Sequence, residues 1–452
     1  MRAGTILIIV GGVLLFMSAL AVGVYLSRDG GGLEASTTNT GQRRFANPSA
    51  VTDEVIAFFQ ARIERDPSDF ISYTKLGEAY IRQARETGDI SAYERAEAAL
   101  RGAMALRPAH LDAGAALALV LYAKHDFAGA LAFAERVYAA DPGATQALAT
   151  IGDAQLELGD YTAARAAYGA LAGVASGPAV FSRLSHVADL SGDPAEAIDL
   201  MRLAEAETTE RARSVEGIAW YRLQLGGLLF STGEYDDAER WYAAALDIFP
   251  GYYPALAGLG MVEGARGNFD EAIVLYEQAV AAVPKPSFLA ALGDLYARTG
   301  DAEAAQRQYE TVEFIGQLAA INRVVYNREL ALFYADHDVE TAKAVDLALA
   351  ELMVRKDIYA YDAAAWALYK DGRVAEAVPL MEEALQLGTR DANLLFHAGL
   401  IARGTGDEAS ARDYLEQALQ INPHFSVLQA GVARETLRTL NAGASPVGVA
   451  RQ

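Results

Sequence analysis

Residues 225–250 read LGGLLFSTGEYDDAERWYAAALDIFP, and six positions of this stretch recur 34 residues later. They are Gly226, Tyr235, Ala238, Tyr242, Ala245 and Pro250, which return as Gly260, Phe269, Ala272, Tyr276, Ala279 and Pro284. Self-similarity at a period of this length is typical of stacked repeats, in which each unit buries its apolar face only against its neighbours. The sequence therefore predicts an extended, all-helical stack without a central pocket for chemistry.

Each unit reads as two helices joined by a turn. Apolar residues three and four apart around Gly226 indicate one face of the first helix. The turn at residues 231–235 contains Gly233, which supplies the backbone freedom that a helix stop needs. Pro250 ends the unit, because proline cannot continue a helix.

The alternation of small and large residues has a packing reason. Glycine in the first helix lets two helix backbones approach closely, and the aromatic ring of the second helix fills the space that remains. We therefore expect Tyr242 and Tyr276 to be buried between helices, with Gly226 and Gly260 close by.

The combination of Leu-Gly, a turn glycine before an aromatic residue, then Ala, Tyr, Ala and a closing proline resembles the tetratricopeptide repeat family. The clearest copies contain Gly152, Gly226, Gly260, Gly293 and Gly399, and weaker copies contain Gly77, Ala118, Ser185, Ala331 and Ala365. The resemblance covers residues 70–425. It implies a superhelical solenoid of about ten antiparallel helix pairs that binds proteins or peptides through its concave groove.

Three stretches interrupt the regular spacing, at residues 85–90, 205–215 and 314–329. We expect hinges or changes of curvature there. Single helices at residues 51–66 and 425–440 are expected to cap the stack, because an uncapped stack would expose its core. The predicted solenoid with its caps spans residues 51–440, and residues 441–452 are expected to form a disordered tail.

The N-terminus contains an apolar run. Residues 5–26 carry no charge, and 22 residues are enough to cross a hydrocarbon layer of about 30 Å. We predict a transmembrane signal anchor at residues 1–28, embedded in the lipid bilayer, and a flexible polar linker at residues 29–50. The alternative is a signal peptide cleaved after Ala19-Leu20-Ala21.

A very short head before the apolar run and a large acidic domain after it predict a single-pass membrane protein with its repeats outside the cytoplasm. Arginines flank the run on both sides, so the opposite orientation stays open. The alanine-rich composition without cysteine suggests bacteria, and together with the anchor it predicts a bacterial cell envelope.

The chain carries a net charge of −21. Residues 1–50 contain four arginines against Asp29 and Glu34, which leaves −23 for the remainder. Nucleic acid is therefore not an expected partner of the repeats, since phosphate binding needs basic patches. The absence of cysteine excludes disulfides and thiolate metal sites.

No residues form a recognisable catalytic, cofactor or metal motif. The six histidines are scattered, and none has the spacing of a metal-binding helix. Asp336-His337-Asp338 is the most metal-like group, but it falls at a turn between paired helices, where capping by polar residues explains it. We therefore predict a protein that is not an enzyme, without catalytic residues, cofactor or metal.

In the family, the first helix of each unit lines the groove. The resemblance implies that Trp366, Tyr369, Phe396, His397 and Arg403 face the groove and bind an extended or helical peptide. The alternative is that Trp366 and Phe396 pack between helices.

Three hypotheses for function follow. The first is a membrane-anchored scaffold that mediates protein–protein interactions as an assembly factor in the envelope. The second is a chaperone-like holder of client proteins, as in cytochrome maturation. The third belongs to another class, a regulatory subunit or an enzyme with an unrecognised site.

Overall fold

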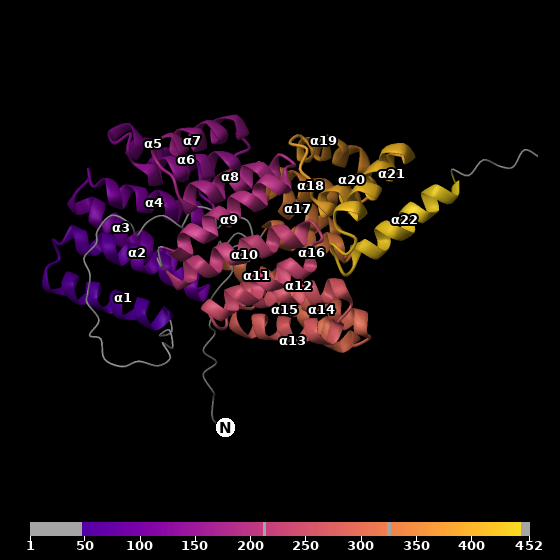
Figure 1. Ribbon diagram of the computed structural model, residues 1–452, viewed down its shortest axis with the longest axis horizontal. Coiled ribbons are helices and arrows are strands. Elements are labelled where there is room, and N and C mark those ends of the chain that lie inside the picture. The colour runs from indigo at the N-terminus through magenta and orange to yellow at the C-terminus, as the bar shows by residue number, and fades with distance from the viewer. Residues whose placement is uncertain (1–47, 211–213, 323–326, 444–452) are drawn as a thin grey trace, which may run out of the picture. The chain divides into compact units, whose positions relative to one another are not determined.

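The computed structural model describes residues 48–210, 214–322 and 327–443, and every regular element within these ranges is a helix (Figure 1). The 22 helices form ten consecutive pairs, with a single helix at each end. This confirms the prediction of an all-α repeat solenoid of about ten helix pairs.

The single helices are α1 (Pro48–Arg65) and α22 (Gln429–Gly443). The pairs are α2 (Phe70–Thr87) with α3 (Ser91–Leu106), α4 (Leu111–Ala123) with α5 (Phe127–Ala140), α6 (Thr145–Glu157) with α7 (Tyr161–Val174), α8 (Pro178–Leu190) with α9 (Pro194–Glu210), α10 (Val215–Ser231) with α11 (Tyr235–Ile248), α12 (Tyr253–Arg266) with α13 (Phe269–Ala282), α14 (Pro286–Thr299) with α15 (Ala302–Asn322), α16 (Asn327–Asp336) with α17 (Thr341–Leu352), α18 (Ile358–Lys370) with α19 (Val374–Ala384), and α20 (Ala392–Thr405) with α21 (Glu408–Ile421).

The predicted contact between glycine and tyrosine holds the pairs together. Tyr242 is fully buried and Tyr276 is buried. A Cβ atom at Gly226 would lie 2.5 Å from Cε1 of Tyr242, and one at Gly260 would lie 2.7 Å from Cδ2 of Tyr276. Only glycine fits at these two positions without displacing the ring.

The same relation recurs along the stack. Gly152 faces Tyr168, Gly293 faces Tyr309 and Gly399 faces Leu415. These are again glycines of a first helix against a large side chain of the second helix of the same pair. The five pairs that contain these glycines therefore share one packing contact.

The first irregular stretch, at residues 85–90, lengthens helices. Helix α2 has 18 residues and α3 has 16, whereas α4 has 13. Gly88 ends α2 in the left-handed conformation with φ of 72°, which glycine adopts at little cost.

The chain divides into two compact units. Among the described residues, unit 1 comprises 48–155, 162–179 and 214–216, and unit 2 comprises 156–161, 180–210, 217–322 and 327–443.

Within unit 2, three turns between paired helices contact linkers that lie far along the chain. The hydroxyl oxygen of Tyr161 accepts a hydrogen bond from the N–H of Ile358 at 2.8 Å. The hydroxyl of Thr389 donates to the carbonyl of Leu190 at 2.5 Å, and the side-chain amide of Asn422 donates to the carbonyl of Phe230 at 2.8 Å.

These contacts join the turns of the third, fourth and fifth pairs to the linkers that follow the eighth, ninth and tenth pairs. We call this set of contacts the seam. An ion pair of 2.7 Å between the buried side chains of Arg355 and Glu157 belongs to it. Unit 2 therefore returns on itself after five helix pairs.

The predicted C-terminal cap begins later than expected. Helix α22 starts at Gln429, whereas the sequence indicated a start near residue 425. Residues 422–428 are not helical and turn into unit 2, where Asn422 and Phe425 are buried. Contacts with other helices therefore override the helical pattern at this end.

No helix within the described ranges combines the length and the apolar character that a membrane span needs. The predicted anchor, most of the linker at residues 29–50, and residues 444–452 of the tail lie outside the described residues.

Candidate functional site

The structure places the five predicted partner-binding residues on two neighbouring first helices of unit 2. Trp366 and Tyr369 lie on α18, and Phe396, His397 and Arg403 lie on α20. Trp366, Phe396 and His397 are buried, Tyr369 is half-buried and Arg403 is exposed.

Trp366 is enclosed by rings of both helices. Its ring stacks on His397 with 4.1 Å between centroids and on Tyr369 with 5.3 Å between centroids. Its indole N–H donates to a carboxylate oxygen of Asp336 at 2.8 Å. Trp366 and Phe396 are therefore buried between helices, as the alternative interpretation had it. Binding of a partner by Tyr369 and Arg403 stays a prediction.

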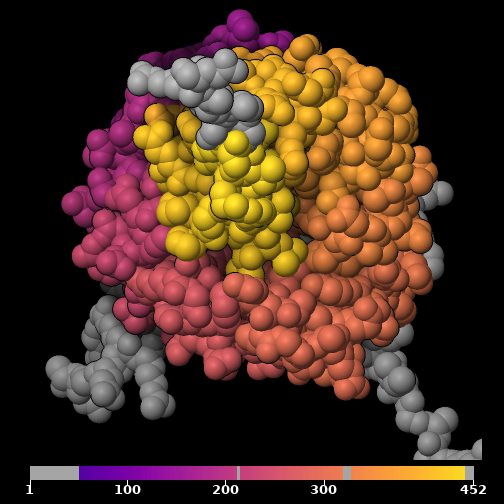
Figure 2. Space-filling model, turned by 90° about the vertical axis from the view of Figure 1, so that its right-hand side faces the viewer, coloured from indigo at the N-terminus to yellow at the C-terminus, as the bar shows by residue number. Residues whose placement is uncertain are grey.

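Asp336 connects three helices of unit 2. Besides the indole of Trp366 on α18, it accepts a hydrogen bond from the side-chain amide of Gln429 at 2.6 Å. Gln429 begins α22, which lies on the face of the molecule shown in Figure 2. Burial raises the pKa of Asp336, and the charge of His397 opposes this shift.

His337 bonds to Asp294 on the preceding first helix. Its Nε2 lies 2.8 Å from a carboxylate oxygen of Asp294, and the hydroxyl of Tyr309 donates to the same oxygen at 2.9 Å. Burial lowers the pKa of His337, but the hydrogen bond and the charge of Asp294 outweigh burial, so that the pKa is raised overall.

His397 makes a second histidine–carboxylate pair. Its Nδ1 lies 2.9 Å from a carboxylate oxygen of Asp362, and both side chains are buried. Burial lowers the pKa of His397, and the nearby carboxylates, led by Asp362, reverse this and raise it.

The Asp336-His337-Asp338 turn caps α16, since Nδ1 of His337 lies 2.7 Å from the carbonyl oxygen of Phe333, and it also makes contacts beyond that cap. The side chains of the first two residues bind those of other helices. Asp338 has φ of 55° and pairs with Lys370 at 2.6 Å. In the part of the chain that the structure describes, no group of three or more His, Asp or Glu side chains is arranged to hold a metal ion.

Unit 1 contains an open cleft that the sequence did not indicate. It has a volume of about 570 Å³, which falls in the range of about 300–1,000 Å³ found for ligand sites. Its lining comes from the first three helices and consists of Gln60, Ile63 and Glu64 of α1, Tyr73, Leu76 and Tyr80 of α2, and Arg95, Ala98 and Ala99 of α3.

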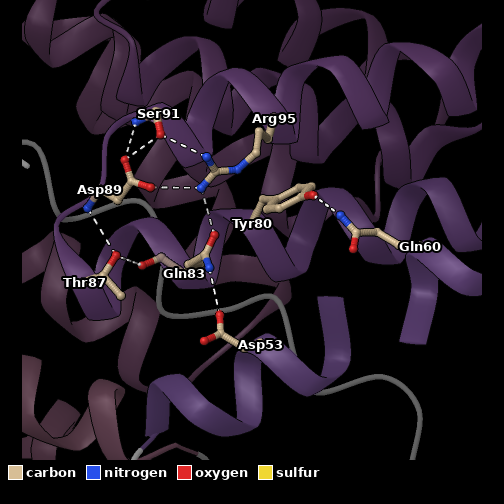
Figure 3. A network of polar contacts seen from close by, with 8 residues as sticks. All are labelled: Asp53, Gln60, Tyr80, Gln83, Thr87, Asp89, Ser91 and Arg95. Atoms are coloured by element: carbon tan, nitrogen blue, oxygen red, sulfur yellow. Dashed lines mark hydrogen bonds and ion pairs between the residues drawn. The ribbon is translucent and has the colours of Figure 1, made fainter. Parts of the chain in front are cut away.

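Arg95 lines the cleft, and Figure 3 shows the hydrogen bonds that hold its guanidinium. Its guanidinium donates to Ser91, to Gln83 and to Asp89 at 2.9–3.0 Å. The same group lies over the ring of Tyr80, 5.2 Å from the centroid. Arginine forms such contacts with little loss of freedom once its plane is held.

The neighbours of Arg95 are held in turn. Asp89 accepts hydrogen bonds from the N–H and the hydroxyl of Ser91. Burial raises the pKa of Asp89, but the bonds from Ser91 and Arg95 outweigh burial and lower it overall. The hydroxyl oxygen of Tyr80 accepts from Gln60 on α1 at 2.8 Å. The cleft therefore has preformed polar walls.

The floor of the cleft offers apolar surface. Leu76 and Tyr80 are buried, and Tyr73 is half-buried. Aromatic rings and aliphatic side chains below a polar rim form the kind of surface on which apolar side chains of a partner are buried. The one signal that could have led here is the stretch that lengthens the first repeat, because Asp89 belongs to it.

Models of the tetratricopeptide repeat match residues 150–212, 216–285 and 363–424. The chain contains tetratricopeptide repeats. Among curated proteins, human protein O-mannosyl-transferase TMTC1 is 27% identical over 221 residues, which cover 47% of this chain and 24% of that protein. The chain thus matches about a quarter of that relative's length.

Solved repeat structures are also similar. A tetratricopeptide repeat protein from Parabacteroides merdae has a TM-score of 0.34 at 16% identity, over 58% of this chain and 97% of the other. Yeast Tom70 has a TM-score of 0.35 at 13% identity, over 88% of this chain and 94% of the other.

Proposed function

We propose that this chain is a tetratricopeptide repeat scaffold that binds protein partners, and that the cleft of unit 1 is one of its binding sites. The observation that carries the proposal is the cleft itself, with an aromatic and aliphatic floor below fixed polar walls. Such preformed surfaces lose little conformational freedom when a partner binds.

The lining favours a peptide or helix that inserts apolar side chains. Tyr73 and Leu76 offer them a floor, and the carboxylate of Glu64 on the exposed rim offers a partner to a basic residue. The guanidinium of Arg95 is already bonded to three side chains, so Arg95 shapes the side of the cleft more than it binds a charge of the partner. A basic, apolar segment of a partner fits these groups best.

Location belongs to the same proposal. The uncharged run at residues 5–26 supports a membrane anchor that holds the repeats outside the cytoplasm of a bacterial envelope. Membrane fractions washed with carbonate should retain an anchored protein, whereas a mature N-terminus at Val22 would mean that the segment is cleaved. In either case the repeats act as an assembly factor for envelope proteins.

The cleft can be tested with a matched pair of substitutions. Ala98 is exposed on the cleft wall in α3, and Ala132 is exposed 34 residues later in α5. Ala98→Trp should fill the cleft and lower capture of the partner by about tenfold or more, the equivalent of about 1.4 kcal/mol. Ala132→Trp should leave capture unchanged.

The measurement is co-purification of the full chain from solubilised membranes, with partners quantified by mass spectrometry. One stoichiometric partner that Ala98→Trp removes supports the scaffold. Equal capture by the wild type and both variants would exclude the cleft as the binding site.

Capture of many clients at low stoichiometry would favour the holder of client proteins. Capture of an enzyme whose rate changes on binding would favour a regulatory subunit. Mannosyl transfer is named for the human relative, of which this chain matches only 24%. Nothing in the cleft lining supports that activity here.

A further inference from the structure

Helix α1 has two faces with different environments. On one face Thr52 and Ile56 are buried, with exposed fractions of 1% and 7%. On the opposite face Val51 is 47% exposed and Phe58 is 54% exposed. Large apolar side chains at this degree of exposure, grouped on one helix face, are typical of an interface.

The exposed face is one continuous stripe. Residues 51, 54, 58, 62 and 65 follow one another at spacings of three, four, four and three, which keeps them on one side of a helix. All five are exposed. The stripe is symmetric about Phe58, because the other four positions lie four and seven residues before it and after it.

Two of the three charges on the stripe complement each other, and the third, Arg65, then lies opposite Val51. Glu54 precedes Phe58 by four residues, and Arg62 follows it by four. If a second α1 lies antiparallel with the two Phe58 rings at the twofold axis, Glu54 of each copy faces Arg62 of the other. In a twofold interface each such contact occurs twice.

We propose that α1 pairs antiparallel with α1 of a second copy of this chain, with Phe58 at the centre. A parallel arrangement would set Glu54 against Glu54 and Arg62 against Arg62, which is repulsive. The antiparallel arrangement also places opposite ends of the two helix dipoles together. This inference does not depend on the cleft or on its partner.

Arg62 is already oriented for this contact. Its guanidinium lies 5.9 Å from the centroid of the Phe58 ring, and one of its nitrogens pairs with Asp69 at 2.8 Å. Its side chain remains 46% exposed. A guanidinium has five N–H donors, so donors remain for a carboxylate of the second copy.

The chain contains no cysteine, so a single introduced thiol reports the interface. In the full chain in detergent, Phe58→Cys with an added oxidant should give a disulfide-linked dimer, because residues on the twofold axis face each other within reach. Val274→Cys, on an exposed site of α13, is the control and should stay uncrosslinked. Equal crosslinking of the two variants would overturn the proposal.

Charge reversal gives a second test, with light scattering as the readout. Glu54→Arg alone and Arg62→Glu alone should each weaken dimer formation by about tenfold, because attraction becomes repulsion at two symmetric contacts. Glu303→Arg, on a highly exposed site of α15, should leave it unchanged.

A mixture of the two weakened variants should form heterodimers as tight as the wild-type dimer, because both opposed charge pairs between positions 54 and 62 are then attractive. Helix content and melting temperature show that each variant is folded. A monomeric wild-type chain, or a mixture that fails to associate, would overturn the proposal. The stripe would then bind residues that precede Pro48, or another protein.

Discussion

Two neighbouring glycines of α10 have different surroundings. A Cβ atom at Gly226 would lie 2.5 Å from Cε1 of Tyr242, a ring that is fully buried and cannot move aside. A Cβ atom at Gly227 would find the nearest atom of another residue, the hydroxyl oxygen of Tyr242, at 4.0 Å. The two glycines therefore lie in the same helix but differ in how closely Tyr242 packs against them.

We expect Gly226→Ala to destabilise the protein by about 1–3 kcal/mol, because the added methyl overpacks the contact with Tyr242. Gly227→Ala should be neutral or should stabilise by up to about 1 kcal/mol, since alanine favours a helix. Thermal melting of both variants checks this. If the two variants have the same melting temperature, the contact between Gly226 and Tyr242 does not contribute to stability.

A pH dependence follows from the pair of His337 and Asp294. The pKa of His337 is raised in the folded state, where Asp294 outweighs burial. A raised histidine pKa stabilises the fold fully below the unfolded value of about 6.5, and this contribution is lost as the pH rises through the folded pKa.

Asp294→Asn should therefore cost more stability at pH 6 than at pH 9. Urea unfolding of wild type and variant at the two pH values measures the difference. Asp336 also raises the pKa of His337 and stays in place in this variant, so the comparison reports the loss of the Asp294 carboxylate. A cost that is equal at both pH values would contradict the assignment.

At the scale of helices, spacing predicted the pairs, the turns and the burial of Tyr242. It could not decide between groove and core for Trp366. Periodicity gives the face of a helix on which a residue lies, but not which other segment covers that face. Trp366 is covered in part by Asp336 on α16. Asp336 in turn binds Gln429, which lies 93 residues further along the chain at the start of α22.

Substitutions on α18 and α20 separate the two roles. Trp366→Ala should cost about 3–5 kcal/mol, because it opens a cavity and removes a donor from Asp336. Tyr369→Ala with Arg403→Ala should cost much less, because Arg403 is exposed and Tyr369 only half-buried.

If Tyr369 and Arg403 bind a partner, the double variant should also weaken its capture by about tenfold or more. Melting temperature and capture per folded molecule are measured together. A large drop in melting temperature with unchanged capture would place these two side chains in the packing of the helices, and the partner would bind elsewhere.

At the scale of unit 2, the repeat period predicts only the contacts within helix pairs and between neighbouring pairs. Small rotations between pairs add up along a solenoid, and their sum decides which distant segments meet. The seam joins residues 192 to 199 positions apart in the chain, which the repeat pattern does not fix. The cleft of unit 1 was missed for a related reason, since it depends on how α1 lies against α2 and α3.

Asn422 tests whether the seam stabilises unit 2. Its side chain is 1% exposed, accepts a hydrogen bond from the hydroxyl of Tyr235 at 2.5 Å and donates one to the carbonyl of Phe230 at 2.8 Å. Asn422→Ala leaves both partners, which are half-buried residues, without their bond to Asn422, which should cost about 1–3 kcal/mol.

Gln420→Ala is the matched control, because Gln420 lies two residues before Asn422, near the end of α21, and is exposed. It should cost less than about 0.5 kcal/mol. Hydrogen exchange should then show faster opening of the turn between α10 and α11 in Asn422→Ala only, since that turn loses its bond to the linker. Equal protection of this turn in both variants would mean that neighbouring pairs alone hold unit 2 together, and that the seam is a contact without energetic weight.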